Sequence, residues 1–369
     1  MRILYGVNGE GLGHATRSQV VIDLLLRRGH DVRVVASGSA FRYLHERLPR
    51  VEEIFGPSFA MDEGEIRRWA TLRQNVMAAP RELPETVRHW IGVVHDWRPD
   101  VVVTDFEPLA ALYARSALVP LVSVDNINML VRCHHDDAIV GPELADFILA
   151  RAITRAMIPT AGDYVVTTFF RPRVLWGRTT LVPPILRPEV VEAEPERGEH
   201  LLVYSSGSHA LIDALRATGM PCRVYGMREA AGSGEDGEIS FRPRSTAGFL
   251  DDLRTARAVV TGGGFSLLSE AVYLRKPVLS APLHGQFEQH RNARYLEREG
   301  YGMCAPEPGL ADLDQFLRRL PEFEAALRGY EQDGNRVALE TIEERVCAAA
   351  DDSQRRRRQA RRLARRAVS

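Results

Sequence analysis

The sequence predicts an α/β protein with two doubly wound, Rossmann-like domains that face each other across a cleft. Its length of 369 residues is too great for one ordinary domain and suits two. Short apolar runs alternate with helical patterns along both halves, which is typical of parallel sheets covered by helices. A stretch rich in proline and glutamate separates the halves. We therefore expect an N-terminal domain, a linker, a second domain with C-terminal helices and an arginine-rich tail at residues 1–185, 186–199, 200–347 and 348–369.

In the first half, apolar runs predict strands at residues 3–7, 32–36, 101–104 and 121–124. Helical patterns predict helices at residues 18–28, 87–97 and 109–117. The run at 101–103 is continuously apolar, as expected for a strand buried on both faces. The segment 53–84 is less regular than the rest of this half.

The second half repeats this alternation after the linker. Strands are expected at residues 201–205, 222–225, 239–241, 258–260 and 278–281, and helices at 210–217, 246–254, 265–273 and within 310–347. In such sheets ligands bind at the carboxyl ends of the strands. Two domains of this kind therefore predict a ligand cleft between them.

Composition bounds the class of protein. The chain is 45% hydrophobic and 26% charged, an ordinary globular composition, and its net charge of −1 gives no general attraction to nucleic acid. No apolar run approaches a membrane span and the N-terminus begins a strand, so we expect a cytoplasmic protein. The four cysteines are far apart, which argues against a zinc site and a disulfide framework. Lys276 is the single lysine, so Schiff-base chemistry has almost no candidate nucleophile.

A glycine turn between a strand and a helix predicts a phosphate site. Gly262, Gly263 and Gly264 follow the strand at 258–260, and the helix that begins at Phe265 and Ser266 opens onto them. Free backbone N–H groups and the positive end of the helix dipole would face an anion, and glycine lets the backbone approach closely. The loop at 282–293 (PLHGQFEQHRNA) reaches the same sheet edge with many hydrogen-bonding groups.

A second glycine-rich loop, residues 9–18 (GEGLGHATRS), follows the first strand. It differs from the dinucleotide fingerprint because His14 replaces the third glycine, and no acidic residue closes a convincing second strand, so NAD binding is disfavoured. Segment 99–108 (PDVVVTDFEP) ends a strand with Asp105 at the same edge.

Together these motifs, in this order and at about this spacing, resemble GT-B glycosyltransferases, and within them the MurG-like nucleotide-sugar transferases. The resemblance runs nearly the whole length of the chain. It implies a GT-B fold, an acceptor site in the first domain and a nucleotide-sugar site, UDP-linked by expectation, in the second. It further implies a metal-independent hexosyltransferase that inverts the anomeric carbon. The nucleotide sugar is a co-substrate, and no cofactor is expected.

For catalysis the resemblance implies that His14 takes the proton from the acceptor hydroxyl, a task suited to an imidazole. The alternative is that His14 only orders its loop or contacts the acceptor. Asp105 would orient His14 or act as the base itself; the competing interpretation makes it the N-cap of the helix near residue 109. Glu10, Glu107 and Asp125 are weaker candidates. The segment 53–84 is expected to carry a loop or helix that faces the acceptor. The residues expected to line the acceptor side are Gly11, Gly13, Arg17, Asn126 and Asn128.

For the donor the resemblance implies contacts from several segments. Ser206 and Gly207 would meet the diphosphate or the sugar, although Ser208 beside them is explained equally well as a helix N-cap. Phe241 would hold the base, and Arg242 or Arg244 could reach the diphosphate or simply be solvated.

Glu270 would accept hydrogen bonds from the ribose hydroxyls, or it serves only the helix dipole. The side chains implied to contact the sugar, directly or as helpers, are His284, Gln286, Glu288 and Gln289.

We expect no metal site, since the Asp-x-Asp triplet of the other main transferase fold is absent from the donor region. The tail carries Arg355, Arg356, Arg357, Arg358, Arg361, Arg362, Arg365 and Arg366. It is a solvated end or a weak contact to anionic lipid, with no nucleic-acid partner expected. The acceptor is open among glycolipid, saccharide and specialised metabolite. Two other functions stay open: a sugar-nucleotide epimerase of the same fold, and a non-catalytic nucleotide-sugar binder.

Overall fold

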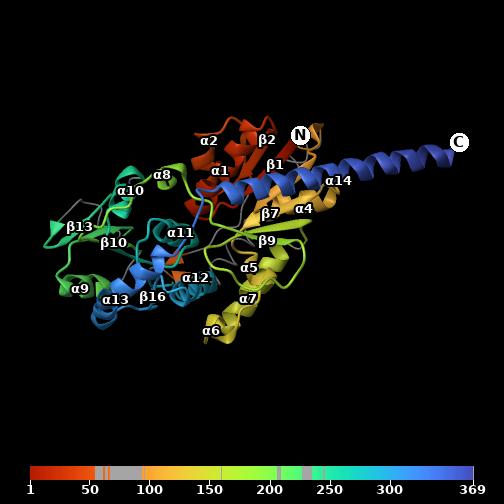
Figure 1. Cartoon of the computed structure of the whole chain (residues 1–369). Helices are drawn as coiled ribbons and strands as arrows, with labels where there is room; N and C mark the ends of the chain where they lie inside the picture. Colours follow the sequence, from red (N-terminus) through yellow and green to blue (C-terminus); the bar gives the residue numbers. More distant parts are fainter. Residues whose placement is uncertain are drawn as a thin grey trace.

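The structure is a computed structural model (Figure 1). It describes residues 1–54, 61–62, 65–66, 94, 96–158, 160–205, 209–226, 235–243 and 246–368. Most of the segment expected to face the acceptor, 53–84, therefore lies outside the described residues, as do Ser206, Gly207, Ser208 and Arg244. Among the described helices, none is both long and apolar enough to cross a membrane.

The first domain is built on a seven-stranded parallel sheet in the order β3-β2-β1-β6-β7-β8-β9. Its strands are β1 (Arg2–Val7), β2 (Asp31–Ala36), β3 (Val51–Glu53), β6 (Val101–Asp105), β7 (Leu121–Asp125), β8 (Asp163–Thr167) and β9 (Thr179–Val182). The helices are α1 (Leu12–Arg27), α2 (Gly38–His45), α4 (Pro108–Ser116), α5 (Met129–Arg132), α6 (Asp137–Val140) and α7 (Leu144–Met157). A short hairpin, β4 (Met61–Asp62) and β5 (Glu65–Ile66), stands apart from the sheet.

The second domain has another seven-stranded sheet, in the order β12-β13-β11-β10-β14-β15-β16, parallel except for the β12–β13 pair. Its strands are β10 (Leu201–Tyr204), β11 (Cys222–Tyr225), β12 (Glu235–Asp236), β13 (Ile239–Phe241), β14 (Ala258–Thr261), β15 (Val278–Ser280) and β16 (Gly302–Cys304). Its helices are α9 (His209–Thr218), α10 (Thr246–Arg254), α11 (Phe265–Tyr273), α12 (Phe287–Arg298) and α13 (Leu310–Arg328).

One apolar core runs from the first domain into the second. It joins Val102 of β6 to Leu268 of α11, and aromatic pairs lie on the boundary. Phe169 stacks on Phe265 with ring centroids 5.8 Å apart, and Phe170 stacks on Tyr295 of α12 at 3.8 Å. The two domains are therefore packed directly against each other.

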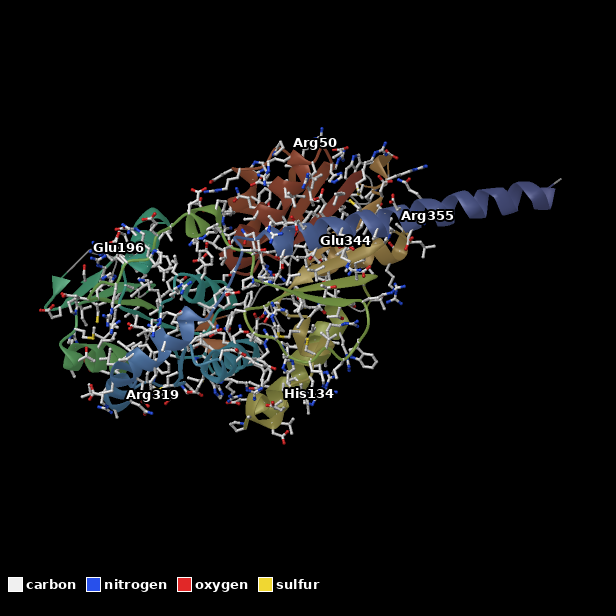
Figure 2. All side chains as sticks on the ribbon, in the orientation of Figure 1. Arg50, His134, Glu196, Arg319, Glu344 and Arg355 are labelled. Carbon is white, nitrogen blue, oxygen red and sulfur yellow. The ribbon has the colours of Figure 1, made fainter. Side chains whose placement is uncertain are left out.

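The C-terminal helix α14 (Arg336–Val368) differs from the expected division of the chain. It returns to the first domain, where Ala338, Ile342, Val346 and Ala350 are buried in the core beneath β6, β7 and β8. These positions recur every four residues and form one apolar helix face. Residues 336–350 thus pack with the first domain rather than the second, and beyond about Arg355 the helix extends past the rest of the chain (Figure 2).

The linker contains a short helix, α8 (Pro188–Val191), and lies beside the return crossing of the chain. Asn335 joins the two crossings, because its amide accepts from the Leu186 N–H at 2.8 Å and donates to the Leu186 carbonyl at 2.8 Å. Farther along, the buried Lys276 donates to the carbonyls of Glu196 and Ala256. The linker is therefore held to the second domain at several points.

The alternation of strands and helices was predicted, with two differences. α1 begins at Leu12, six residues before the expected start, because Gly11 supplies the turn that opens it. Strands β3, β8, β9, β12 and β16 and helices α2, α5, α6, α7 and α8 were not predicted, nor was α12, which begins inside the loop expected at 282–293. Their sequences are short or carry polar side chains inside the pattern, so a local period did not reveal them.

Candidate active site

His14 lies in the first turn of α1 and not in the loop before it. Gly11 precedes the helix with φ 71°, a left-handed conformation that favours glycine. A Cβ at Gly13 would collide with the Ser266 hydroxyl of the second domain. The N-terminus of α1 therefore meets the N-terminus of α11, and Gly13 faces Ser266 at the boundary between the two domains.

Asp105 is brought to His14 by the sheet. It ends β6, pairs in register with Val7 of β1, and is buried. The next residue, Phe106, has a φ of 53°, which is uncommon outside glycine and turns the chain sharply after the carboxylate. The Nδ1 atom of His14 lies 2.7 Å from Oδ1 of Asp105. The expected pairing of these two side chains is present.

Arg17, one turn after His14, also binds Asp105. Its Nε donates to Oδ2 at 2.7 Å and its Nη2 contacts Oδ1, while Ser18 donates to Oδ2 at 2.9 Å. Arg17 was expected to contact the acceptor. The structure instead places its buried guanidinium on the catalytic-site carboxylate, because the helix puts positions 14, 17 and 18 on one face.

Electrostatics keep Asp105 ionised. Burial favours the neutral carboxyl, but Arg17 and His14 outweigh burial and lower the pKa of Asp105 to about 2. Nη2 of Arg17 also lies 2.7 Å from Nδ1 of His14, but a guanidinium cannot accept a hydrogen bond. The anionic Asp105 can accept one, so we assign a proton to Nδ1 of His14, which donates to Asp105. Nε2 is then the unprotonated nitrogen that can receive a proton.

Glu107, not Asp105, is the N-cap of α4. Its Oε1 accepts from the Leu109 N–H at 2.9 Å and its Oε2 from the Ala110 N–H at 2.5 Å. The interpretation of Asp105 as a helix cap is therefore wrong. Burial raises the pKa of Glu107 to about 7, although the two backbone N–H groups act in the opposite direction.

This raised pKa predicts a pH-dependent stability. The folded state keeps the Glu107 proton up to about pH 7, whereas the unfolded chain releases it near pH 4.5. The contribution of Glu107 to the unfolding free energy should therefore fall as the pH rises from about 5 to about 7, by up to roughly 3 kcal/mol. The buried His135 acts in the opposite direction, because burial lowers its pKa to about 4, so the wild type has to be compared with Glu107→Gln. Urea unfolding at several pH values measures this. In Glu107→Gln the fall should be absent; parallel curves for both proteins would refute the assignment.

The glycine turn of the second domain lies where it was expected, between β14 and α11. Gly263 has φ 96°, and a Cβ there would lie 2.9 Å from the Gln289 carbonyl and 3.0 Å from Ser280 Oγ. Gly264 is the N-cap of α11, and no heavy atom lies within 4 Å of the position of its Cβ. The turn is therefore tightly packed at one glycine and open at the next, beside the helix N-terminus.

The residues expected to contact the sugar lie at the start of α12. Gln286 is its N-cap, and Gln289 donates to Gln286 Oε1 at 2.5 Å and accepts from the Leu283 N–H at 3.1 Å. His284 is exposed. The negative charge of Glu288 acts on Arg17 of the first domain. Burial acts to lower the pKa of Arg17, but Asp105 and, more weakly, Asp125 and Glu288 raise it.

Arg291, which the sequence did not indicate, links the two sides. Its guanidinium is fully buried and bonds to Asn126 Oδ1 at the end of β7 and to Asn292 Oδ1 at 2.9 Å. Asn292 donates to the carbonyl of Gly263 at 3.2 Å. Burial lowers the pKa of Arg291, partly opposed by Glu288. Among the described residues no carboxylate lies within ion-pair distance of this cation.

Asn126 was expected to line the site of the acceptor substrate, but its side chain is hydrogen-bonded within the protein. It is fully buried, donates to the Thr167 carbonyl at 2.8 Å and accepts from Arg291. Through Arg291 and Asn292, its amide links the end of β7 to the glycine turn. No local sequence pattern could have revealed this contact, because 165 residues separate Asn126 and Arg291.

Glu270 has a partner that was also missed. Arg187, the N-cap of α8 in the linker, donates Nε to Oε1 at 2.7 Å and Nη2 to Oε2 at 2.8 Å. This bidentate ion pair is largely buried. Each carboxylate oxygen has a second lone pair, so the pair leaves acceptor capacity for hydroxyl groups.

Phe241 and Arg242 lie at the end of β13, half-buried and exposed respectively. Arg242 Nε is 3.8 Å from Asp252 Oδ2, and Asp252 also accepts from Tyr225 at 2.6 Å. In the part of the chain that the structure describes, no three His, Cys, Asp or Glu side chains gather to hold a metal ion. His135 bonds to Tyr295 and to the Met129 carbonyl, both at 3.1 Å.

Comparison with known proteins shows which family and which solved structures the chain is similar to. A family model described as glycosyl transferase family 1 matches residues 1–321. An uncharacterized glycosyltransferase of Methanosarcina mazei is 24% identical over 333 residues, which cover 82% of this chain and 85% of the relative. One of Methanosarcina acetivorans is 28% identical over 375 residues, covering 89% and 93%.

Solved structures share the fold. The glycosyltransferase VinC in complex with dTDP superposes with a TM-score of 0.63 at 16% identity, covering 95% of this chain and all of that one. The calicheamicin glycosyltransferase CalG4 gives 0.63 at 18% identity, covering 93% and 98%. The spinosyn rhamnosyltransferase SpnG, complexed with spinosyn aglycone, gives 0.57 at 16%, covering 89% and 94%.

Proposed function

The chain belongs to glycosyl transferase family 1 and has the GT-B fold, and on this premise we propose that it moves a hexosyl group from a nucleotide sugar to an acceptor hydroxyl with inversion. It is a glycosyltransferase by family. The donor, with UDP as the expected nucleotide, the stereochemistry and the independence from metal belong to the proposal.

The observation that carries the proposal is the His14–Asp105 pair facing the glycine turn. Asp105 accepts from Nδ1 of His14, which leaves Nε2 to take the proton of the acceptor hydroxyl. As that oxygen bonds to the anomeric carbon, the bond from this carbon to the diphosphate oxygen breaks on the opposite face. The contact of Gly13 with Ser266 supports a base that reaches the donor from across the domain boundary.

Negative charge develops on the nucleoside diphosphate as its bond to the anomeric carbon breaks. The N-terminus of α11 and the N–H groups of the turn at 262–264 would stabilise it. The open space at Gly264 supports this placement. Arg291 would add a buried positive charge behind the turn, at a distance that the link through Asn292 sets.

The acceptor is proposed to enter from the first domain. VinC and SpnG have been solved with dTDP or thymidine diphosphate, and SpnG also with spinosyn aglycone. An aglycone acceptor and a thymidine nucleotide therefore have to be tested beside the expected UDP. Glycolipid, saccharide and specialised metabolite remain the acceptor classes of the proposal.

Calorimetry with UDP, GDP and TDP tests the donor site. We expect one nucleotide to bind tightly and Glu270→Ala to weaken it by about 1–3 kcal/mol, the scale of hydrogen bonds lost to a carboxylate. Arg187→Gln is the matched control, because it breaks the same ion pair and keeps the carboxylate.

Three results would count against the proposal. Equal losses in both variants would mean that the ion pair, and not the ribose, accounts for the effect. No binding of any nucleotide by the wild-type protein would remove the nucleotide-sugar donor altogether. Consumption of a nucleotide sugar without any acceptor, giving an epimer, would favour the epimerase.

A further inference from the structure

Helix α7 turns its apolar side toward solvent. Leu144 is 56% exposed, Ile148 59%, and Leu149 and Ile153 44% each. The alanines at 145, 152 and 156 are exposed between them, whereas Asp146, Arg151 and Thr154 are half-buried or buried. A surface helix normally buries its apolar stripe. This helix presents that stripe outward over its whole length.

The loop between β8 and β9 exposes further apolar side chains. Val174, Leu175 and Trp176 are exposed, Trp176 by 52%, and the exposed Arg171, Arg173 and Arg178 flank them. The loop is fixed to the end of α5, because Leu175 N–H donates to the Arg132 carbonyl and His134 N–H to the Arg173 carbonyl, both at 2.9 Å. α5 also packs on α7 (Figure 1), so the loop and the helix share α5 as a direct neighbour.

We name α7 and the loop 171–178 the arginine-rimmed face. It holds five arginines and one acidic side chain, Asp146. Two of the arginines, Arg151 and Arg155, lie one turn apart; burial first, and then Arg155, lowers the pKa of Arg151. A symmetric dimer through this face would bring two cationic rims together, which disfavours a second copy as its occupant. An anionic partner with an apolar interior fits better.

We propose that the arginine-rimmed face lies on an anionic lipid surface. Tryptophan prefers the membrane–water interface, and leucine and isoleucine enter the outer acyl region. Arginines around them meet the anionic head groups. α7 has 14 residues, too few to span a bilayer, so it would lie in the interface. The inference does not depend on the donor, and it differs from a contact through the arginine-rich tail, whose side chains from 356 lie outside the described ones.

Vesicle flotation of the full chain tests this. We expect it to float with vesicles of phosphatidylcholine containing about 30% phosphatidylglycerol and to stay behind with phosphatidylcholine alone. The double substitution Leu175→Ser, Trp176→Ser should weaken binding at least about tenfold, and Arg173→Glu about fivefold or more. The matched control is Leu112→Ser on α4, a leucine that is 57% exposed but away from this face. It should float like the wild type.

A spectroscopic readout separates insertion from mere adsorption. The chain has four tryptophans, and Trp176 emission should shift to the blue on the anionic vesicles. Trp176→Phe should keep flotation and lose that shift. Nucleotide binding should be unchanged in all these variants, so failure here and failure of the proposed donor site are distinguishable. The proposal is overturned if the wild type does not float, if Leu112→Ser weakens binding equally, or if only substitution of Arg355–Arg358 abolishes it.

Discussion

Replacing Asp105 by asparagine is expected to lower kcat by about 10³–10⁴-fold while KM for the donor changes little. Asparagine keeps the shape of the side chain but loses the anion that holds the Nδ1 proton of His14. The ring would then be free to present the wrong tautomer to the acceptor. Asparagine would also no longer stabilise the imidazolium that forms when His14 takes the proton. Steady-state kinetics with a saturating donor measure the effect.

The same substitution leaves Arg17 buried without its counter-ion, so stability also has to be followed. Assays should therefore run well below the unfolding midpoint of each variant. His14→Gln provides the second variant, since it removes the base and keeps the Arg17–Asp105 pair; it should lose kcat by a similar factor. Glu107→Gln is the matched control, a buried carboxyl two residues away that only caps α4. Normal turnover in His14→Gln would exclude His14 as the base.

The sequence was sufficient for the pairing of His14 with Asp105. His14 comes shortly after β1 and Asp105 ends β6, and the carboxyl ends of these neighbouring parallel strands meet at one edge of the sheet. The glycine turn could be predicted for the same reason, since a strand, three glycines and a helix are consecutive in the chain. Local order along the sequence determined these positions.

The partners of the site residues could not be predicted in this way. Arg187 is 83 residues from Glu270, and Arg291 is 165 residues from Asn126. Each pair depends on how the linker and α12 pack against another part of the fold, which no local pattern encodes. Arg17 is an intermediate case. Its helical spacing from His14 was visible in the sequence, but its binding to Asp105 depends on burial beside that carboxylate, which the sequence did not show.

Two adjacent glycines of the turn at 262–264 are expected to respond in opposite ways. Gly263→Ala should lower the unfolding free energy by about 2–4 kcal/mol. Its backbone is left-handed, and the new Cβ would lie 2.9 Å from the Gln289 carbonyl, so the turn has to move. Because the Gly263 carbonyl is bonded to Asn292, the displacement would reach the Arg291 link, and nucleotide affinity should fall as well.

Gly264→Ala is the counterpart. Its φ of −61° suits alanine and its Cβ would meet no protein atom within 4 Å, so the unfolding free energy should change by less than about 1 kcal/mol, the usual cost at an N-cap. If the empty space belongs to the diphosphate, nucleotide binding should nevertheless weaken, by about tenfold, as the methyl group enters it. Urea unfolding and calorimetry on both variants give the comparison. A stable Gly264→Ala protein with unchanged nucleotide affinity would mean that the diphosphate lies elsewhere, because the backbone N–H groups at the start of α11 could not approach a phosphate without meeting that methyl group.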